Sequence, residues 1–231
     1  MNHFFAQLNQ DLKQSELALP RLIVDAQAFE QNLHYAEKKF QYAPHVQPRL
    51  VVKSLACLEL LKQISQRLAT QRFMVFHLPQ LLPILETFSD ADVLLGKPMP
   101  VSLLQYFYQE NHHWQHAKIQ WLVDTQQRLE QYLDVAKKFA IKLKISIEID
   151  VGLHRGGVSS EQDLRSILSF IQTHAEYLEF AGLMGYDAHV TKLPSIIKKA
   201  EDAYAESQQI YQNYQLLIQR QFPKLWHDEL C

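Results

Sequence analysis

Short apolar runs alternate along this chain with longer segments of helical periodicity, and this alternation constrains the fold more than any other feature. Six of the runs begin near residues 49, 72, 91, 119, 143 and 178, which is about the spacing of βα units. Such alternation predicts a parallel sheet with helical crossovers. Six units in order favour most of a parallel (β/α)8 barrel of TIM type, an α/β fold, over a doubly wound sheet. No Gly-x-Gly-x-x-Gly or phosphate-loop motif supports the doubly wound alternative.

The same patterns give expected bounds for the individual elements. The expected strands cover residues 21–25, 49–53, 72–77, 91–96, 119–123, 142–150 and 178–186. The expected helices cover residues 26–39, 55–68, 81–88, 102–110, 125–139, 162–175 and 195–220. Thr125 and Asp124 are competing N-caps for the helix that ends near Phe139. Residues 222–226 are interpreted as the start of a seventh strand.

Composition excludes several classes of protein. The chain has 231 residues, 47% of them hydrophobic, and a formal net charge of -2, so it has no basic footprint for nucleic acid or an anionic membrane. No apolar run approaches the roughly 20 residues of a membrane span, and the first residues lack the layout of a secretory signal. The two cysteines, Cys57 and Cys231, form no disulfide framework. We therefore expect a cytoplasmic globular protein.

Polar side chains follow the ends of the expected strands. In a barrel the chemistry gathers at the carboxyl ends of the strands. A lysine amine in that position is well placed to condense with a carbonyl, and burial there would favour its neutral, nucleophilic form. We expect one constellation on this rim, consisting of Lys53, His77, Gly96, Asp124, Arg155 and Tyr186.

Other reactive residue types have simpler interpretations. His112, His113 and His116 have spacings that a metal site uses, but they fall in a polar stretch between elements, so a solvated loop is favoured and no metal is predicted. Cys57 has apolar neighbours and is expected to be a small core residue rather than a nucleophile. His154 and His189 lie beside glycine-rich turns, and both are expected to be exposed.

Four segments together resemble a known family. They are Pro20–Asp25 followed by a helix, Arg49–Ser54 with its strand-ending lysine, Glu148–Val158 (Glu-Ile-Asp-Val-Gly-Leu-His-Arg-Gly-Gly-Val) and Ala181–Tyr186. In this order they resemble the alanine racemase-like pyridoxal-phosphate enzymes, most closely the D-threonine aldolase and D-serine dehydratase branch. The resemblance covers roughly residues 20–190.

The resemblance implies roles for particular residues. Lys53 would be the catalytic residue and would hold pyridoxal phosphate as a Schiff base. Arg155 would lie beside the cofactor ring and its phenolic oxygen, and Tyr186 would flank the ring or the phosphate. His77, at the end of the neighbouring strand, is a further candidate for binding the cofactor. The implied substrate is a small D-amino acid or β-hydroxy amino acid, handled by aldolase, dehydratase or racemase chemistry in a homodimer.

The chain departs from this family towards its end. None of its glycines follows Gly185, so the glycine-rich phosphate-binding turns of the last two barrel strands have no counterpart. We interpret residues 26–231 as a partial barrel, and residues 1–25 as a segment whose strand would join a C-terminal β domain that is absent. Two alternatives remain open, a non-catalytic pyridoxal-phosphate-binding protein of cofactor homeostasis and an inactive fragment.

Overall fold

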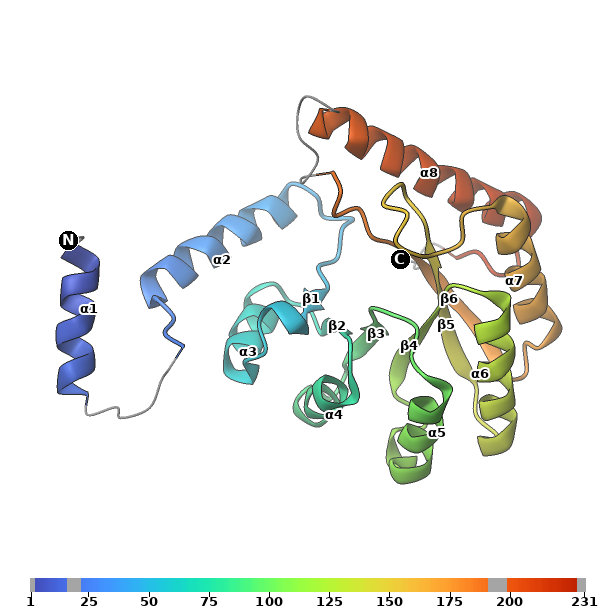
Figure 1. The fold of residues 1–231 in the computed structure, drawn as a ribbon, viewed down its shortest axis with the longest axis horizontal. Coiled ribbons are helices and arrows are strands. Elements are labelled where there is room, and N and C mark those ends of the chain that lie inside the picture. Colours follow the sequence, from blue (N-terminus) through green and yellow to red (C-terminus); the bar gives the residue numbers. More distant parts are fainter. Residues whose placement is uncertain (1–2, 16–21, 191–198, 228–231) are drawn as a thin grey trace. The chain divides into compact units, whose positions relative to one another are not determined.

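The computed structural model describes residues 3–15, 22–190 and 199–227. The chain divides into two compact units, residues 1–46 and 47–231. The first unit contains helices α1 (His3–Gln14) and α2 (Ala26–Gln41), and the second contains the sheet and the remaining helices (Figure 1). No helix in these described ranges is long and apolar enough to cross a membrane.

In the first unit, α2 confirms the helix expected from residue 26. Its N-cap is Asp25, whose side chain accepts a hydrogen bond from the backbone N–H of Ala28 at 3.0 Å. The strand expected at residues 21–25 is wrong for its described part, because residues 22–25 have no regular secondary structure and belong to no described strand. Arg21 lies outside the described residues. A strand needs a partner for its backbone N–H and C=O groups, and an apolar pattern does not supply one.

The second unit is built on six parallel strands that lie in the order of the sequence, β1-β2-β3-β4-β5-β6. The strands are β1 (Leu50–Val51), β2 (Arg72–Val75), β3 (Asp92–Leu95), β4 (Lys118–Val123), β5 (Leu143–Ile149) and β6 (Leu178–Gly185). The sheet is curved but not closed, because β1 and β6 each pair with one neighbour among the described strands. This order confirms the α/β fold of a TIM-type barrel with six βα units.

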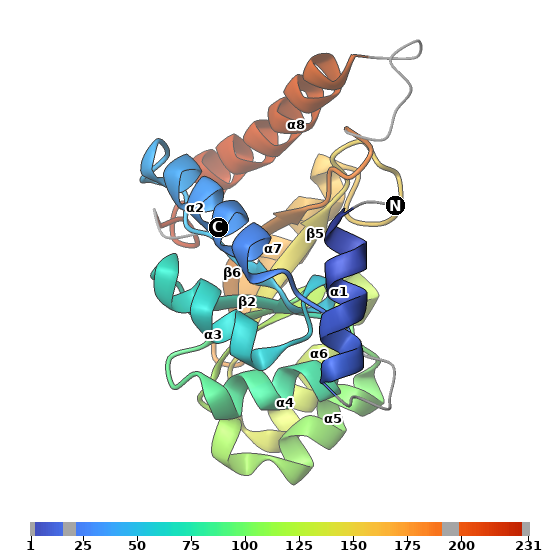
Figure 2. The same cartoon turned by 90° about the vertical axis from the view of Figure 1, so that its left-hand side faces the viewer.

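A helix follows each strand along the chain, and these helices lie one after another around the outside of the curved sheet (Figures 1 and 2). They are α3 (Leu58–Arg67), α4 (Leu78–Thr87), α5 (Val101–Glu110), α6 (Gln126–Phe139), α7 (Glu161–Thr173) and α8 (Ala200–Gln221), with short 3-10 turns η1 (Val52–Ser54) and η2 (His112–Trp114). Because the strands are parallel, their carboxyl ends all lie at one edge of the sheet and their amino ends at the other.

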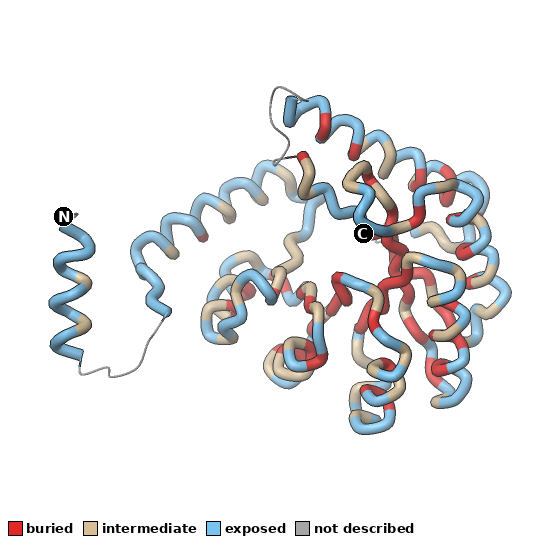
Figure 3. The backbone as a smooth tube through the Cα atoms, in the orientation of Figure 1, coloured by how far each residue is buried: buried red, intermediate tan, exposed pale blue. Residues whose placement is uncertain are grey.

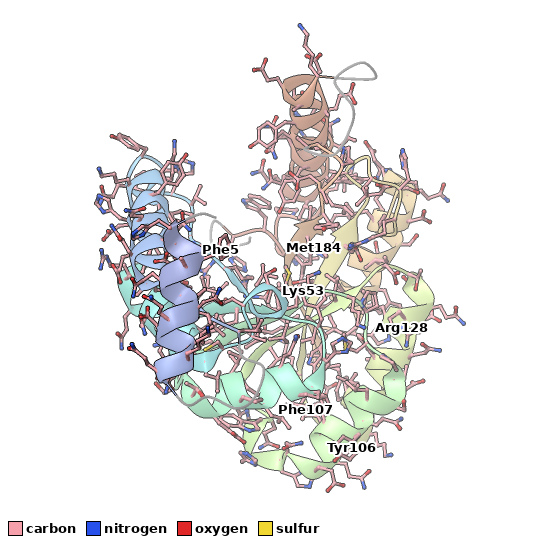
Figure 4. All side chains as sticks on the ribbon, turned by 60° about the vertical axis from the view of Figure 1, so that its left-hand side comes forward. Phe5, Lys53, Tyr106, Phe107, Arg128 and Met184 are labelled. Carbon is pink, nitrogen blue, oxygen red and sulfur yellow. The ribbon has the colours of Figure 1, made fainter. Side chains whose placement is uncertain are left out.

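The main core lies between the sheet and these helices. Buried residues gather along the strands, shown in red in Figure 3. The largest fully buried side chains include Trp121, Tyr132, Phe73 and Phe107. Helix α5 has a buried side and an exposed side: Phe107 is fully buried, whereas its neighbour Tyr106 is 57% exposed (both are labelled in Figure 4). Burying one stripe of each helix against the sheet is what fixes the positions of the strand ends.

The opposite face of the sheet carries a separate, smaller apolar cluster. It consists of Leu94, Leu122 and Met184, with Met74 packed against it. Towards the amino ends of the strands the same face becomes polar. There the Arg49 guanidinium pairs with Asp92 at 3.1 Å, the Gln120 amide donates to Asp92 at 2.8 Å, and the Ser146 hydroxyl donates to Gln120 at 2.9 Å. This chain of side chains ties β3, β4 and β5 together.

The structure corrects three of the expected bounds. The strand expected at residues 49–53 ends at Val51, because the backbone turns into η1, where the N–H of Leu55 donates to the Val52 carbonyl. The helix expected from residue 195 is described from Ala200 onwards, and residues 195–198 lie outside the described part. The seventh strand is wrong, because residues 223–225 form a turn after α8. Of the competing caps, Thr125 caps α6 by accepting from the N–H of Arg128.

Candidate active site at the carboxyl edge of the sheet

The residues expected on the rim all follow the carboxyl ends of the strands. Gly96, Asp124 and Tyr186 come directly after β3, β4 and β6, while Lys53 and His77 come two residues after β1 and β2. Arg155 lies in the loop after β5. Because the strands are parallel, these positions share one edge of the sheet, as expected, while their assembly into a single constellation stays a prediction.

Lys53 belongs to a cluster formed after β1, β2 and β3. Its side chain is exposed, and its Nζ atom lies 3.9 Å from the centroid of the Phe76 ring (Lys53 is labelled in Figure 4). Gly96 is buried beside the same ring. The expectation of a lysine desolvated at the end of a buried strand is therefore wrong for these described residues, since Lys53 lies in an exposed 3-10 turn.

Arg155 belongs to a second cluster, formed by β5 and β6. Its Nη2 atom donates a hydrogen bond to Oε1 of Glu148 at 3.1 Å, and its guanidinium carbon lies 4.2 Å from the centroid of the Tyr186 ring. The Glu148 side chain is only 7% exposed, whereas that of Arg155 is 47% exposed. A buried carboxylate thus fixes a guanidinium that faces solvent, and the guanidinium stacks on an aromatic ring that is itself part of the rim.

Burial and the Arg155 guanidinium affect the pKa of Glu148 in opposite directions. Burial raises the pKa of the Glu148 carboxyl above its ordinary value, and the hydrogen bond and positive charge of Arg155 oppose this increase. The negative charges of Asp124 and Asp150 raise the pKa further. Asp124 therefore acts on this cluster through its charge.

Asp150 shapes the loop that carries Arg155. It accepts hydrogen bonds from the backbone N–H groups of Gly152 and His154 at 3.0 and 2.9 Å, and its other oxygen contacts Nδ1 of His154 at 2.7 Å. Burial alone would raise the pKa of Asp150, but these hydrogen bonds together hold it below its ordinary value. The loop closes where the N–H of Val158 donates to the Glu148 carbonyl at 2.8 Å.

Gly157 makes this closure possible. Its φ angle is +94°, and a Cβ atom there would lie 2.7 Å from the carbonyl carbon of Ile149. A side chain at this position would meet backbone that cannot move aside, and the φ angle itself favours glycine. Gly156, by contrast, has nothing within 4 Å of the position of a Cβ atom. The glycine pair of the sequence motif therefore contains one position that needs glycine for geometric reasons.

Comparison with known proteins identifies the family. The sequence profile of the alanine racemase N-terminal domain matches residues 24–223. The chain belongs to this family. No curated protein matches the chain significantly in sequence.

Solved structures of related enzymes share the fold of this family member. They include the D-threonine aldolase of Filomicrobium marinum (20% identity, 81% of this chain and 49% of that chain, TM-score 0.68). The alanine racemase of Bacillus anthracis is also similar (15% identity, 87% of this chain and 50% of that chain, TM-score 0.65). So is a variant of D-threo-3-hydroxyaspartate dehydratase (14% identity, 88% of this chain and 54% of that chain, TM-score 0.68). The chain spans about half the length of these proteins. At these identities the likeness shows the fold.

Three further histidines and Cys57 differ in how far they are exposed in this alanine racemase-type domain. His77 precedes α4 and is exposed; its carbonyl accepts from the N–H groups of Gln80 and Leu81, and its imidazole forms no hydrogen bond with the described residues. His154 is 83% exposed, as expected. His189 is not simply exposed, because its Nε2 atom lies 3.3 Å from the Ser207 hydroxyl and its Nδ1 atom is buried. Cys57 is exposed at the start of α3, so the expectation of a core residue is wrong.

The histidines near η2 are exposed on the surface. His112 and His113 lie in η2, and His116 follows it. Among the described residues no group of three or more His, Cys, Asp or Glu side chains is arranged to hold a metal ion.

Sequence reasoning missed two residues of the site, Phe76 and Glu148. The alternation of side chains between the two faces of a strand could have indicated both residues. Phe76 lies two residues after Met74, and Glu148 two residues after Ser146, so each continues the row that faces away from the helices. What the sequence does not reveal is the register that brings each of them to its cationic neighbour.

Proposed function

We propose that the chain is the lysine-bearing part of a pyridoxal-phosphate enzyme that acts on a small D-amino acid or a β-hydroxy amino acid by aldolase, dehydratase or racemase chemistry. One observation carries this proposal: at a single edge of the sheet, an exposed lysine amine occurs together with a guanidinium that a buried carboxylate holds in place. Membership of the alanine racemase N-terminal domain family supports it, as does the fold shared with a D-threonine aldolase and a dehydratase.

The residues at this edge fit the aldehyde and the ring of pyridoxal phosphate. The Lys53 amine is accessible and can condense with an aldehyde. The Arg155 guanidinium presents donors suited to a phenolic oxygen, while Tyr186, 39% exposed, offers a flat face. His77 is a further candidate for contact with the ring.

Bound pyridoxal phosphate supplies an electron sink for negative charge that develops at the α carbon of an amino acid. The residues of this chain would orient the groups and move protons. Lys53 would take the α proton on one face of the substrate and return a proton there. Arg155 would keep a fixed positive charge beside the ring, and Glu148 would hold Arg155 in place from the buried side. The proposal extends to a homodimer in the cytoplasm, which size-exclusion chromatography and localisation of a tagged protein would test.

Titration of the purified protein with pyridoxal phosphate tests the binding part of this proposal. We expect a visible absorbance band that stays with the protein through desalting and is absent from the variant Lys53→Ala. Lys97→Ala is the matched control, because Lys97 is also an exposed lysine just after a strand. The control should retain the band.

A panel of D- and L-amino acids then separates an enzyme from a binding protein. Turnover of a D-amino acid or a β-hydroxy amino acid, lost in Lys53→Ala, would support the enzyme. Stable binding without turnover on the whole panel would favour a non-catalytic pyridoxal-phosphate-binding protein instead. Absence of any band in the wild-type protein would refute both functions.

A further inference from the structure

The position of the Lys53 amine over one aromatic ring needs an explanation of its own. The Nζ atom lies 3.9 Å from the centroid of the Phe76 ring, within the range of a cation–π contact. In the described part of the chain the Lys53 side chain has no hydrogen bond or ion pair, so this ring is the partner that the described residues offer. A lysine side chain has four flexible bonds, and holding its amine at one place costs conformational freedom.

The Phe76 backbone is fixed on both sides. Phe76 follows β2 directly, and its N–H donates to Oε1 of Gln80 in α4 at 2.8 Å. One residue earlier, the carbonyl of Val75 accepts from the N–H of Gly96 at 2.8 Å. The ring therefore projects from a backbone that is held by the next helix and by the neighbouring strand.

Gly96 creates the space that this ring occupies. A Cβ atom at Gly96 would lie 2.4 and 2.5 Å from two atoms at the far end of the Phe76 ring and 3.0 Å from Cγ of Met74. Even alanine at this position would thus push the ring away. The φ angle of Gly96 is not positive, so the space for the ring, rather than the backbone conformation, is the reason for glycine here.

We propose that Phe76 is the positioning residue of Lys53: its ring holds the amine at the carboxyl edge of the sheet where the cofactor attaches, and Gly96 provides the space for the ring. The inference rests on the proposed function of Lys53 as the attachment site. Three consecutive strands contribute one residue each to this arrangement, which explains why an exposed lysine has a defined place. Phe76 itself need not touch the substrate.

A readout that is independent of the cofactor tests the positioning. Reductive methylation with 13C-labelled formaldehyde converts lysine amines to dimethylamines that keep their positive charge, and the face of an aromatic ring shifts nearby methyl signals upfield. We expect the Lys53 signal, assigned by its absence in Lys53→Arg, to lie upfield of the other lysine signals. Lys39 and Lys138 serve as internal references, because their amines lie farther from aromatic rings, at 5.1 and 5.3 Å.

Substitutions of the ring and of Gly96 give opposite controls. In Phe76→Leu and in Gly96→Ala the Lys53 signal should lose its upfield shift, while the signals of Lys39 and Lys138 stay unchanged. In Phe76→Trp the shift should remain. A Lys53 signal that Phe76→Leu leaves in place would overturn the proposal, and so would an unshifted Lys53 signal in the wild-type protein.

Attachment of pyridoxal phosphate links the positioning to function. In Phe76→Leu a smaller share of the attached pyridoxal phosphate should be found on Lys53 and a larger share on other exposed lysines, because the amine is no longer held at one place, and Phe76→Trp should restore the share on Lys53. An unchanged distribution of the cofactor among the lysines would mean that the ring does not position the amine and would refute the inference. If the wild-type protein shows the ring-current shift but binds no cofactor, the proposed function fails while the contact between Phe76 and Lys53 stands.

Discussion

The Arg155–Glu148 pair predicts that the effect of replacing Arg155 on the free energy of unfolding depends on pH. Replacing Arg155 with methionine leaves the Glu148 carboxylate, 7% exposed, without its cation. A hydrogen bond to a charged group contributes about 1.5–3 kcal/mol, and because Arg155 is half exposed, screening by solvent reduces this to about 1–2 kcal/mol. Loss of the contact with Tyr186 adds about 0.5 kcal/mol at any pH.

The sign of the pH dependence follows from the raised pKa of Glu148. Because burial favours the protonated form in the folded state, the stability contributed by this group is complete below the ordinary pKa of a glutamate and decreases as the pH rises through the raised value. Removing the guanidinium raises the pKa of Glu148 further and makes this decrease larger. The cost of Arg155→Met should therefore be about 1.5–2.5 kcal/mol near neutral pH and fall to about 0.5 kcal/mol near pH 4.

Urea-induced unfolding at the two pH values, followed by circular dichroism, measures this difference. Arg165→Met is the matched control, because Arg165 is 40% exposed and pairs with Glu161 at 2.6 Å, but Glu161 is 57% exposed. A surface pair of this kind contributes at most about 1 kcal/mol, so the control should lose little at either pH. If Arg155→Met costs the same free energy of unfolding at both pH values, the buried carboxylate does not depend on Arg155 and the reasoning is refuted.

Two further predictions concern the loop after β5. Gly157→Ala should lower the free energy of unfolding by about 1–3 kcal/mol, because of its φ angle and its approach to the Ile149 backbone, whereas Gly156→Ala should change it by less than about 0.5 kcal/mol; thermal unfolding of both variants checks this, and equal costs would contradict it. Asp150→Asn should cost about 1 kcal/mol near neutral pH, because the amide can still accept from both backbone N–H groups but offers no acceptor to His154. The pKa of Asp150 is lowered, so its contribution exists above the ordinary pKa of an aspartate and is lost as the pH falls through the lower folded-state value; acid unfolding of the two proteins should therefore converge, and a constant gap would count against this role.

Most of the fold could be predicted because its strands are buried on a regular pattern. The alternation of Leu143, Ile145, Ile147 and Ile149 predicts β5 to within one residue at each end, since every second side chain must enter the core. The run at residues 22–24 is also apolar, with the β-branched residues Ile23 and Val24, but no described strand lies beside it. Periodicity reports which side chains can be buried, and not whether a backbone partner exists.

The candidate site could be predicted as a set of positions and not as a set of contacts. Lys53, Arg155 and Tyr186 were expected on one edge because parallel strands end together. The contact between Lys53 and Phe76 depends on the register that pairs Val51 with Met74, which no local pattern specifies. The contact between Arg155 and Glu148 likewise depends on a loop that folds back along its own strand.

The site at which pyridoxal phosphate attaches tests the central claim most directly. The purified protein would be loaded with the cofactor, reduced with borohydride, digested and mapped by mass spectrometry. The account predicts one modified lysine per chain, Lys53, and loss of that modification in Lys53→Arg with Lys97 still unmodified. Modification spread over several exposed lysines, or a protein that retains no cofactor after reduction, would contradict it.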